Sequence, residues 1–390
     1  MKHTLKTTAT YLLAVLLFLL MFAAGYFTHA YLNPATSKFA ILDDVYRLIG
    51  EHGYQPMPDP PAMEYGAIRG LVESYGDPHT RFLEPVRAEL QGDMLSGSYG
   101  GIGAKLARDG DGRVVLHPFP DSPASEAGLL DGDRLLQVDN QPITPETPLA
   151  NVVAAIRGPE DQPVTLTIAR PPDGSQMTFT VKRANIPLPS VTWNIDPVDP
   201  LLGMVHVNVI ASSTPDEIIK AVADLQERGA TRFALDLRGN GGGLLDEGVN
   251  IARLFLKDGV IIQRQEKNGD VKTYKVQEAG PLSNIPLVIL VDSGTASASE
   301  IIAGSIQAHS RAPLVGVPTY GKDTIQSVFS LADHSSLAVT SAKWWVPGLP
   351  APVGEGGLQP DIAVSPENSG DADPYLEAAR TCFREENPAP

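Results

Sequence analysis

The stretch "IPLVILVDSGTASASEIIAGSIQAH", residues 285–309, decides the fold class. Its first seven residues indicate a buried strand, and the segment from Ser297 onward has the spacing of a helix. The same strand–helix alternation occurs upstream, in "LLGMVHVNVI" (201–210), "PDEIIKAVADLQERG" (215–229), "RFALDLRG" (232–239) and "LLDEGVNIARLFL" (244–256). Such alternation predicts a largely parallel α/β layer with right-handed crossovers.

Functional sites of parallel sheets form at the carboxyl ends of the strands. The segments "DLRGNGGG" (236–243) and "DSGTASAS" (292–299) both lie at such ends. Ser297 followed by Glu300 fits a capping box, in which a serine simply begins a helix. The alternative is that Ser297 is a nucleophile, which would require a nearby base.

Histidine is the usual base, but His309 follows Ser297 on the same predicted helix and lies too far along it, about 18 Å at 1.5 Å per residue. Four other histidines are distant from Ser297 in sequence and could act on it only if the fold brought them close: His79, His117, His206 and His334. The sequence therefore neither supports nor excludes a Ser-His-Asp triad.

Lysine is the other candidate base, and "VGVPTYGKDTIQSVFSL" (315–331) places Lys322 after a glycine turn and before a strand. Alone, this pattern is typical of a surface lysine. A catalytic lysine must be buried or lie near positive charge, because otherwise almost none of it is neutral at pH 7. Gln326 lies four residues on, on the same strand face, where its amide could orient the lysine amine.

The glycines of residues 239–243 indicate either a flexible turn or a backbone that can approach a substrate carbonyl closely. In the second interpretation the turn supplies one amide of an oxyanion hole, and Ala298 supplies a second amide.

"GVPTYGKD" (316–323) also matches most of a phosphate-binding loop. Asp323 replaces the required hydroxyl residue, however, and a strand pattern follows, which argues against nucleotide binding.

Outside this core the sequence predicts four further regions. A membrane anchor or signal with its cytoplasmic tip covers residues 1–35, a small helical region covers 36–96, a domain of short strands and glycine turns covers 97–185, and a tail covers 371–390. The α/β core then spans 186–370 and begins with a proline-bearing connector at 186–200. The predicted fold class is therefore a multidomain α+β and α/β protein.

Composition excludes one broad class of function. The 390-residue chain carries 46 acidic and 30 basic side chains, a net charge of −16, which argues against nucleic acid as a partner. Cys382 is the only cysteine, so no intramolecular disulfide can form, and no metal-ligand spacing surrounds it.

Lys2 and Lys6 precede an uncharged segment, residues 11–27. This pattern predicts an N-terminus in the cytoplasm and a single membrane anchor, with the remaining chain on the outer side. A cleaved signal peptide is the alternative, although no clear cleavage site follows. With an anchor, we expect the protein at a bacterial inner membrane, with its catalytic part in the periplasm or outside the cell. With a cleaved signal, we expect the protein to be secreted to the same side.

Taken together, several motifs resemble the carboxyl-terminal processing (tail-specific) protease family of serine proteases, over roughly residues 64–365. The resemblance rests on six segments in the family's order: "YGDPHTRFL" (75–83), "GSYGGIGAKL" (97–106), "DSPASEAGLLDGDRLLQVD" (121–139), "LDLRGNGGG" (235–243), "GTASASEIIAG" (294–304) and "YGKDTIQ" (320–326). The resemblance implies Ser297 as nucleophile, Lys322 as base and Gln326 as its orienting partner. It also implies the amides of Gly243 and Ala298 as oxyanion donors.

Residues 97–185 resemble the family's PDZ domain. The resemblance implies that this domain binds apolar C-termini of protein substrates, and that its loop amides receive the terminal carboxylate. The loop residues are Tyr99, Gly100, Gly101, Ile102 and Gly103. No metal or organic cofactor is implied, whereas an activating adaptor protein and the oligomeric state stay open.

Two features depart from the family pattern: Asp323 replaces a usual glycine, and the chain after "LAVTSAKWWVPG" (337–348) is richer in proline and glycine. An inward-facing Asp323 would oppose base catalysis, although alternation along a strand favours an orientation toward solvent. The expected function is a serine endopeptidase that cleaves proteins near their C-termini. The rival is a non-catalytic PDZ adaptor on an inactive protease scaffold.

Overall fold

The computed structural model describes residues 15–25, 39–365 and 373–386. The chain divides into two compact units, Met1–Ile68 and Arg69–Pro390. Residues 15–25 are helical, and within these described ranges no helix is both long and apolar enough to cross a membrane. The predicted anchor, residues 1–35, falls largely outside the described residues and stays a prediction.

Helices occupy most of the region in which the sequence indicates them. They are α2 (Ala40–His52), α3 (Pro60–Tyr75) and α4 (Pro85–Ser96). Helix α4 ends at Gly97, whose φ of 75° is the left-handed conformation that glycine adopts easily at a helix end. The short strand β1 (Arg81–Leu83) was not indicated by the sequence, because the strand with which it pairs, β18 (Ser336–Trp345), lies more than 250 residues further on.

Residues 98–187 form a small domain around a sheet of order β3-β4-β5-β7-β8, with β6 paired to β5. Its core follows from simple alternation: Val164, Leu166 and Ile168 on β7 are buried, and α6 adds Val152 and Ile156. A separate strand pair joins β2 to β9. The elements are β2 (Ser98–Gly101), β3 (Ala104–Arg108), β4 (Val114–Pro118), α5 (Pro123–Glu126), β5 (Asp133–Val138), β6 (Gln141–Pro142), α6 (Leu149–Ile156), β7 (Pro163–Arg170), β8 (Ser175–Lys182) and β9 (Ala184–Pro187).

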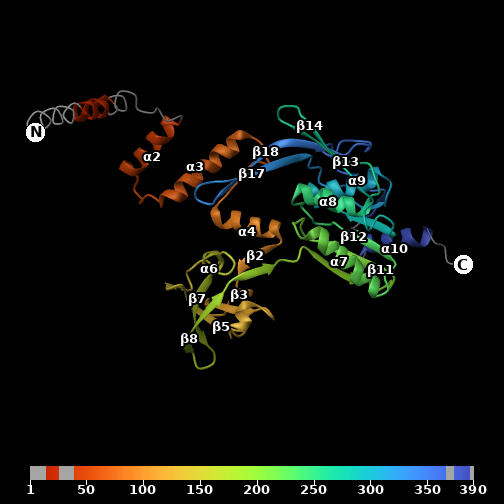
Figure 1. The fold of residues 1–390 in the computed structure, drawn as a ribbon, viewed down its shortest axis with the longest axis horizontal. Helices are drawn as coiled ribbons and strands as arrows, with labels where there is room; N and C mark the ends of the chain where they lie inside the picture. Colours follow the sequence, from red (N-terminus) through yellow and green to blue (C-terminus); the bar gives the residue numbers. More distant parts are fainter. Residues whose placement is uncertain (1–14, 26–38, 366–372, 387–390) are drawn as a thin grey trace, which may run out of the picture. The chain divides into compact units, whose positions relative to one another are not determined.

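The α/β layer predicted from the sequence is a six-stranded sheet of order β10-β11-β12-β15-β16-β19 (Figure 1). Its strands run parallel except β10, which is antiparallel to β11. One face packs against α7, α8 and α9, and the other packs against α10. The elements are β10 (Val191–Ile195), β11 (Leu202–Val207), α7 (Thr214–Glu227), β12 (Arg232–Asp236), α8 (Leu245–Phe255), β15 (Leu287–Val291), α9 (Ala298–Ala308), β16 (Leu314–Gly316), β19 (Ile362–Ala363) and α10 (Pro374–Glu386).

The segment 186–200, expected as a connector, instead contributes to β9 and β10. Pro187 ends β9 and Pro189 lies between the strands, so neither proline interrupts a strand interior. The five residues of β10, "VTWNI", are mostly β-branched or aromatic and suit a strand.

A second sheet, antiparallel throughout, joins β1, β18, β13 and β14, with β17 paired to the other side of β18. The sequence indicates individual strands here but not their common sheet. The bounds are β13 (Val260–Glu266), β14 (Val271–Lys275), β17 (Thr324–Ser330) and β18 (Ser336–Trp345). A strand rather than a helix follows Lys322, as expected, which removes the structural basis for a phosphate-binding loop.

Helix α10 should contribute measurably to stability, because Phe383 is only 4% exposed in the core between this helix and the sheet. We expect Phe383→Ala to lower the free energy of unfolding by about 3 kcal/mol. Urea unfolding measures the change, with Leu201→Ala, at a 46% exposed position, as control. Equal effects of the two substitutions would contradict the docking of α10.

Candidate active site

Ser297 lies in a strained turn between β15 and α9. Its φ of 57° and ψ of −119° are rare for a residue with a side chain, and such strain collects at functional sites. The preceding loop holds this turn in place: Asp292 Oδ1 accepts hydrogen bonds from the amides of Gly294 (2.9 Å) and Thr295 (3.1 Å). The Thr295 hydroxyl in turn donates to the carbonyl of Leu237 (2.9 Å). Ser297 is therefore presented by a fixed turn at the carboxyl end of a strand.

The Glu300 carboxylate is fully buried and connects the Ser297 turn to the Lys322 loop. Its Oε2 accepts from the amides of Ser297 (2.8 Å) and Lys322 (2.9 Å). Its Oε1 accepts from the Thr319 hydroxyl (2.6 Å) and the Gly321 amide (2.7 Å). The capping-box pattern in the sequence signalled the bond to Ser297, but nothing in it signalled the three bonds to residues 319–322.

The surroundings of Lys322 shift its amine toward the neutral form. Burial, followed by the positive charge of Arg81, lowers the pKa of Lys322 below that of an ordinary lysine, while Glu300 and Asp77 act in the opposite direction. Asp323 does not reverse this balance, because its partly exposed carboxylate lies against Gly354 and does not line the cavity with Lys322. The departure from the family pattern at Asp323 thus leaves the candidate base unaffected.

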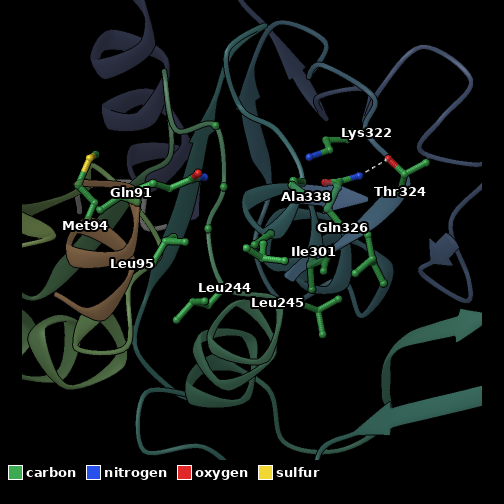
Figure 2. A pocket seen from close by; sticks show the side chains of 18 of the residues that line it. Gln91, Met94, Leu95, Leu244, Leu245, Ile301, Lys322, Thr324, Gln326 and Ala338 are labelled. Atoms are coloured by element: carbon green, nitrogen blue, oxygen red, sulfur yellow. Dashed lines mark hydrogen bonds between the residues drawn. The ribbon is translucent and has the colours of Figure 1, made fainter. Parts of the chain in front are cut away.

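Gln326 lies beside Lys322, on β17 (Figure 2). Its Nε2 donates to the hydroxyls of Thr324 (3.1 Å) and Thr340 (3.2 Å). This arrangement leaves the amide oxygen as the acceptor that a lysine amine could use. That Gln326 orients Lys322 stays a prediction.

The glycine turn packs directly against Ser297. Asn240 is 1% exposed and fixes the turn: its Nδ2 donates to the Val207 carbonyl (2.7 Å), and its Oδ1 accepts from the Gly242 amide (2.9 Å). Gly242 has a φ of 101°, and a Cβ there would lie 2.9 Å from the Cβ of Ser297. A side chain at Gly243 would collide with the carbonyl of Ile210. Both positions therefore require glycine.

The amides expected to form the oxyanion hole are available. In the described part of the chain, neither the Gly243 nor the Ala298 amide has a hydrogen-bond partner. Ala298 is the first residue of α9, where helix amides lack internal acceptors and the helix dipole favours negative charge.

One cavity of about 320 Å³ brings the predicted catalytic residues together (Figure 2). Its lining includes Ser297, Ala298, Gly243, Lys322 and Gln326, which come from three separate segments of the chain. The remaining lining is largely apolar, with Leu95, Val209, Leu244, Leu245, Ile301, Ile325, Val328 and Trp344.

No histidine lines this cavity among the described residues. His206, one of the alternative bases, lies on β11 with its Nδ1 3.2 Å from Asp236 Oδ2. The geometry thus favours lysine over histidine as the base.

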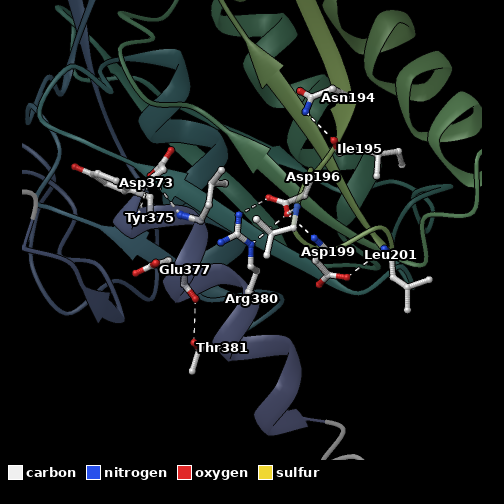
Figure 3. Close-up of polar contacts among 12 residues, drawn as sticks. Asn194, Ile195, Asp196, Asp199, Leu201, Asp373, Tyr375, Glu377, Arg380 and Thr381 are labelled. Carbon is white, nitrogen blue, oxygen red and sulfur yellow. Dashed lines mark hydrogen bonds and ion pairs between the residues drawn. The ribbon is translucent and has the colours of Figure 1, made fainter. Parts of the chain in front are cut away.

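A polar network on the α10 side of the sheet supports the glycine turn, and Figure 3 shows the part of it in which Arg380 of α10 pairs with Asp196. Arg238, next to Gly239, forms paired hydrogen bonds with Asp236 (2.8 and 2.7 Å) and with Asp373 (3.2 and 2.9 Å). Burial alone would raise the pKa of Asp236, but hydrogen bonds from Arg238 and His206 bring it below its usual value. Sequence reasoning missed this network, because Asp373 lies 135 residues from Arg238.

A second cavity lies in the 98–187 domain. Tyr99, Gly101, Ile102 and Gly103 line it, together with Ala104, Leu106, Val153, Ile156 and Arg157. Gly100 does not line it, because this residue backs onto Gly158, whose amide donates to the Gly100 carbonyl (3.2 Å). Ser98–Gly101 pair with β9, so only Ile102 and Gly103 lie in the loop itself.

Arg157 joins this second cavity to helix α4. Its guanidinium carbon lies 4.4 Å from the centroid of the Tyr99 ring, and its Nη1 pairs with the carboxylate of Asp93. Asp93 is the residue before Met94 and Leu95, both of which line the Ser297 cavity. The two cavities are thus connected through a single helix.

The role of Glu300 can be tested through stability. Glu300→Gln replaces one carboxylate oxygen with an NH₂ group, which cannot accept a hydrogen bond. The donors that face this group therefore lose their acceptor. We expect the free energy of unfolding to fall by about 2 kcal/mol, measured in urea. Glu278→Gln, at an exposed position, should change it little. An unchanged stability of Glu300→Gln would contradict the four-bond arrangement.

Comparisons with known proteins agree with the geometry. A sequence model of the peptidase family S41 matches residues 201–364, and a PDZ domain model matches residues 115–170. A carboxyl-terminal-processing protease of Picosynechococcus sp. is 37% identical over 309 residues, covering 78% of this chain and 74% of the relative. The carboxy-terminal processing protease CtpA of Bacillus subtilis is 31% identical over 356 residues, covering 90% of this chain and 73% of the relative.

Among solved structures, a photosystem II D1 C-terminal processing protease matches with a TM-score of 0.45 and 31% identity, covering 87% of this chain and 89% of the other. The sequence relationships suffice to assign the family. The chain is a serine peptidase of family S41 with a PDZ domain, and it belongs to the carboxyl-terminal processing proteases.

Proposed function

We propose that this peptidase cleaves protein substrates near their C-termini, through a Ser297–Lys322 dyad and an acyl-enzyme. The observation that carries the proposal is the shared cavity of Ser297, Lys322 and Gln326 with the free amides of Gly243 and Ala298. A nucleophile, a base of lowered pKa and two converging amide donors are the components that acyl transfer requires.

In the first half of the reaction, the Ser297 hydroxyl attacks the scissile carbonyl and neutral Lys322 takes its proton. The carbonyl oxygen becomes an oxyanion, which the amides of Gly243 and Ala298 stabilise. When the C–N bond breaks, the Lys322 ammonium returns the proton to the leaving amine, and Ser297 carries the acyl group.

The second half repeats these roles with water. Lys322, neutral again, takes a proton from the attacking water, and the same two amides hold the second oxyanion. Collapse of this intermediate releases the new C-terminus and returns the proton to Ser297. Gln326 serves the dyad if its amide oxygen accepts from the Lys322 amine, an orientation that its two threonine contacts favour.

The PDZ domain is proposed to capture substrate C-termini. Its cavity is lined by the apolar side chains of Leu106, Val153 and Ile156, which suit an apolar terminal residue. The loop amides of Ile102 and Gly103 would receive the terminal carboxylate, with the strand edge pairing to the peptide. The Arg157–Asp93 pair then offers a route by which an occupied cavity influences helix α4.

We further propose that the catalytic part lies outside the cytoplasm, at or beyond a bacterial inner membrane. The support is the uncharged segment 11–27, preceded by Lys2 and Lys6. An activating adaptor protein is compatible with this arrangement, because the connection from the PDZ cavity to α4 is a place where a partner could act.

Substitution of the dyad tests the proposal. With an unstructured protein that ends in an apolar residue as substrate, we expect Ser297→Ala and Lys322→Ala each to lower kcat/KM at least about a thousandfold. Ser293→Ala and Lys343→Ala, both at exposed positions nearby, should cleave at the wild-type rate. Retained cleavage in both dyad variants would rule out the mechanism, and a wild type that binds such tails without cutting them would favour the adaptor alternative.

The pH dependence should report on Lys322. Since only neutral Lys322 accepts the serine proton, kcat/KM rises with pH through the Lys322 pKa, which lies below that of an ordinary lysine. Arg81→Gln removes a positive charge that lowers this pKa, so the rise should move to higher pH. A pH–rate profile measures the shift, with Arg87→Gln as the charge-matched control; a profile that stays in place or moves to lower pH contradicts the assignment.

A further inference from the structure

The charges of the Ser297 cavity are unusual for this chain. The protein carries a net charge of −16, yet the only ionisable side chains that line the described cavity are two basic ones, Arg81 and Lys322, and no carboxylate joins them. A cleft lined by charges of one sign concentrates ions of the other sign. The cavity is therefore suited to an anionic group, although the surface as a whole repels one.

The backbone of Arg81 is held firmly. Strand β1 pairs with β18 so that Arg81 lies opposite Ala338, itself a lining residue. Just before it, the buried Thr80 hydroxyl donates to Asp77 Oδ2 (2.5 Å) and accepts from the Thr340 amide (3.2 Å). The motif "YGDPHTRFL" thus fixes the strand that presents Arg81 to the cavity.

The Arg81 guanidinium has no ion-pair or hydrogen-bond partner within the described residues. Other arginines of the protein do have carboxylate partners, among them Arg157 with Asp93 and Arg380 with Asp196. A guanidinium offers a planar set of donors that matches a carboxylate with two parallel hydrogen bonds. An exposed, unpaired guanidinium on a fixed strand is therefore an available carboxylate site.

The position of Arg81 assigns it to one side of the scissile bond. Figure 2 shows Lys322, Gln326 and Ala338 at one end of the cavity, away from Leu244 and Leu245. Lys322 is the group that returns a proton to the leaving amine, so the leaving segment must pass this end. Arg81 shares it, as the strand neighbour of Ala338.

We propose that Arg81 forms an anion subsite that binds a carboxylate on the leaving segment of the substrate. The carboxylate is either the terminal carboxylate of a short leaving segment or the side chain of an aspartate or glutamate within it. This inference rests on the proposed peptidase function and specifies its substrate: the enzyme prefers bonds followed closely by a negative charge.

The test uses the full chain and four peptides that share one sequence with an apolar residue before the cleaved bond. The two-residue leaving segment ends in a free acid or a carboxamide, and its first residue is aspartate or asparagine. Products are quantified by mass spectrometry for the wild type, Arg81→Gln, Arg81→Lys and Arg87→Gln. Arg87 is exposed on α4 and does not line the cavity, so it is the charge-matched control.

We expect the wild type and Arg87→Gln to cleave at least one carboxylate-bearing peptide with a kcat/KM about tenfold above that of its uncharged counterpart. In Arg81→Gln this ratio should fall to about one, and Arg81→Lys should retain part of it. The acid–carboxamide pair reports on a terminal carboxylate, and the aspartate–asparagine pair reports on a side chain. Since any effect of Arg81 on the Lys322 base acts on all four peptides alike, the ratio isolates carboxylate binding.

Two results would overturn the subsite and leave the peptidase function intact. One is that the wild type cleaves the carboxylate-bearing and the uncharged peptide of each pair with equal kcat/KM. The other is that Arg81→Gln keeps the wild-type preference for the carboxylate-bearing peptide, which would then arise elsewhere, such as in the PDZ domain. If the wild type cleaves neither the peptides nor an unstructured protein, the proposed function and the subsite both fail. Circular dichroism confirms that the variants compared are folded.

Discussion

One buried carboxylate, that of Glu300, fixes the relation between Ser297 and Lys322, the proposed nucleophile and base. A carboxylate has about four positions at which it can accept a hydrogen bond. In Glu300 all four are occupied, by the amides of Ser297, Gly321 and Lys322 and by the hydroxyl of Thr319. None is therefore left for the Lys322 amine. Glu300 holds the backbone of the base without forming the ion pair that would keep its side chain protonated. The same residue can thus lie close to a catalytic lysine and still permit its pKa to fall.

The turn at Ser297 stores strain that the surrounding loops must hold. A backbone conformation of this kind costs roughly 1–3 kcal/mol and persists only when its neighbours fix it. Here Asp292 binds amides on both sides of the site, Gly239 at 2.8 Å and Gly294 at 2.9 Å, so one carboxylate links the glycine turn to the nucleophile loop. Ala296 adds a backbone bond to Asn240 (3.0 Å). The glycine turn and the Ser297 loop, which carry the proposed oxyanion donors and nucleophile, are therefore tied together by hydrogen bonds.

What the sequence could predict depended on whether the signal was local. The strand–helix alternation and the glycine turn each lie within a short window, so the α/β layer followed from them, and the family motifs then indicated Ser297 and Lys322. The three bonds from Glu300 to residues 319–322, the pairing of β1 with β18 and the Arg238–Asp373 contact join distant segments and leave no local pattern. The strand β10 was missed for another reason: the prolines around it resemble a linker, although they flank the strand rather than interrupt it.

The two faces of the parallel sheet are not independent. Leu237 accepts the Thr295 hydroxyl bond on the catalytic side, and the residues on either side of it, Asp236 and Arg238, pair with each other and extend to Asp373 at the start of α10. Arg380 of the same helix forms two bonds to the buried Asp196 (3.2 and 2.8 Å) and so anchors α10 to the strand edge. Buried charges of this kind need well-placed partners, because their desolvation cost otherwise exceeds the attraction. Asp236 and Arg238 lie shortly before Gly239, so the C-terminal helix supports, through Asp373, the start of the glycine turn that we propose to supply an oxyanion donor.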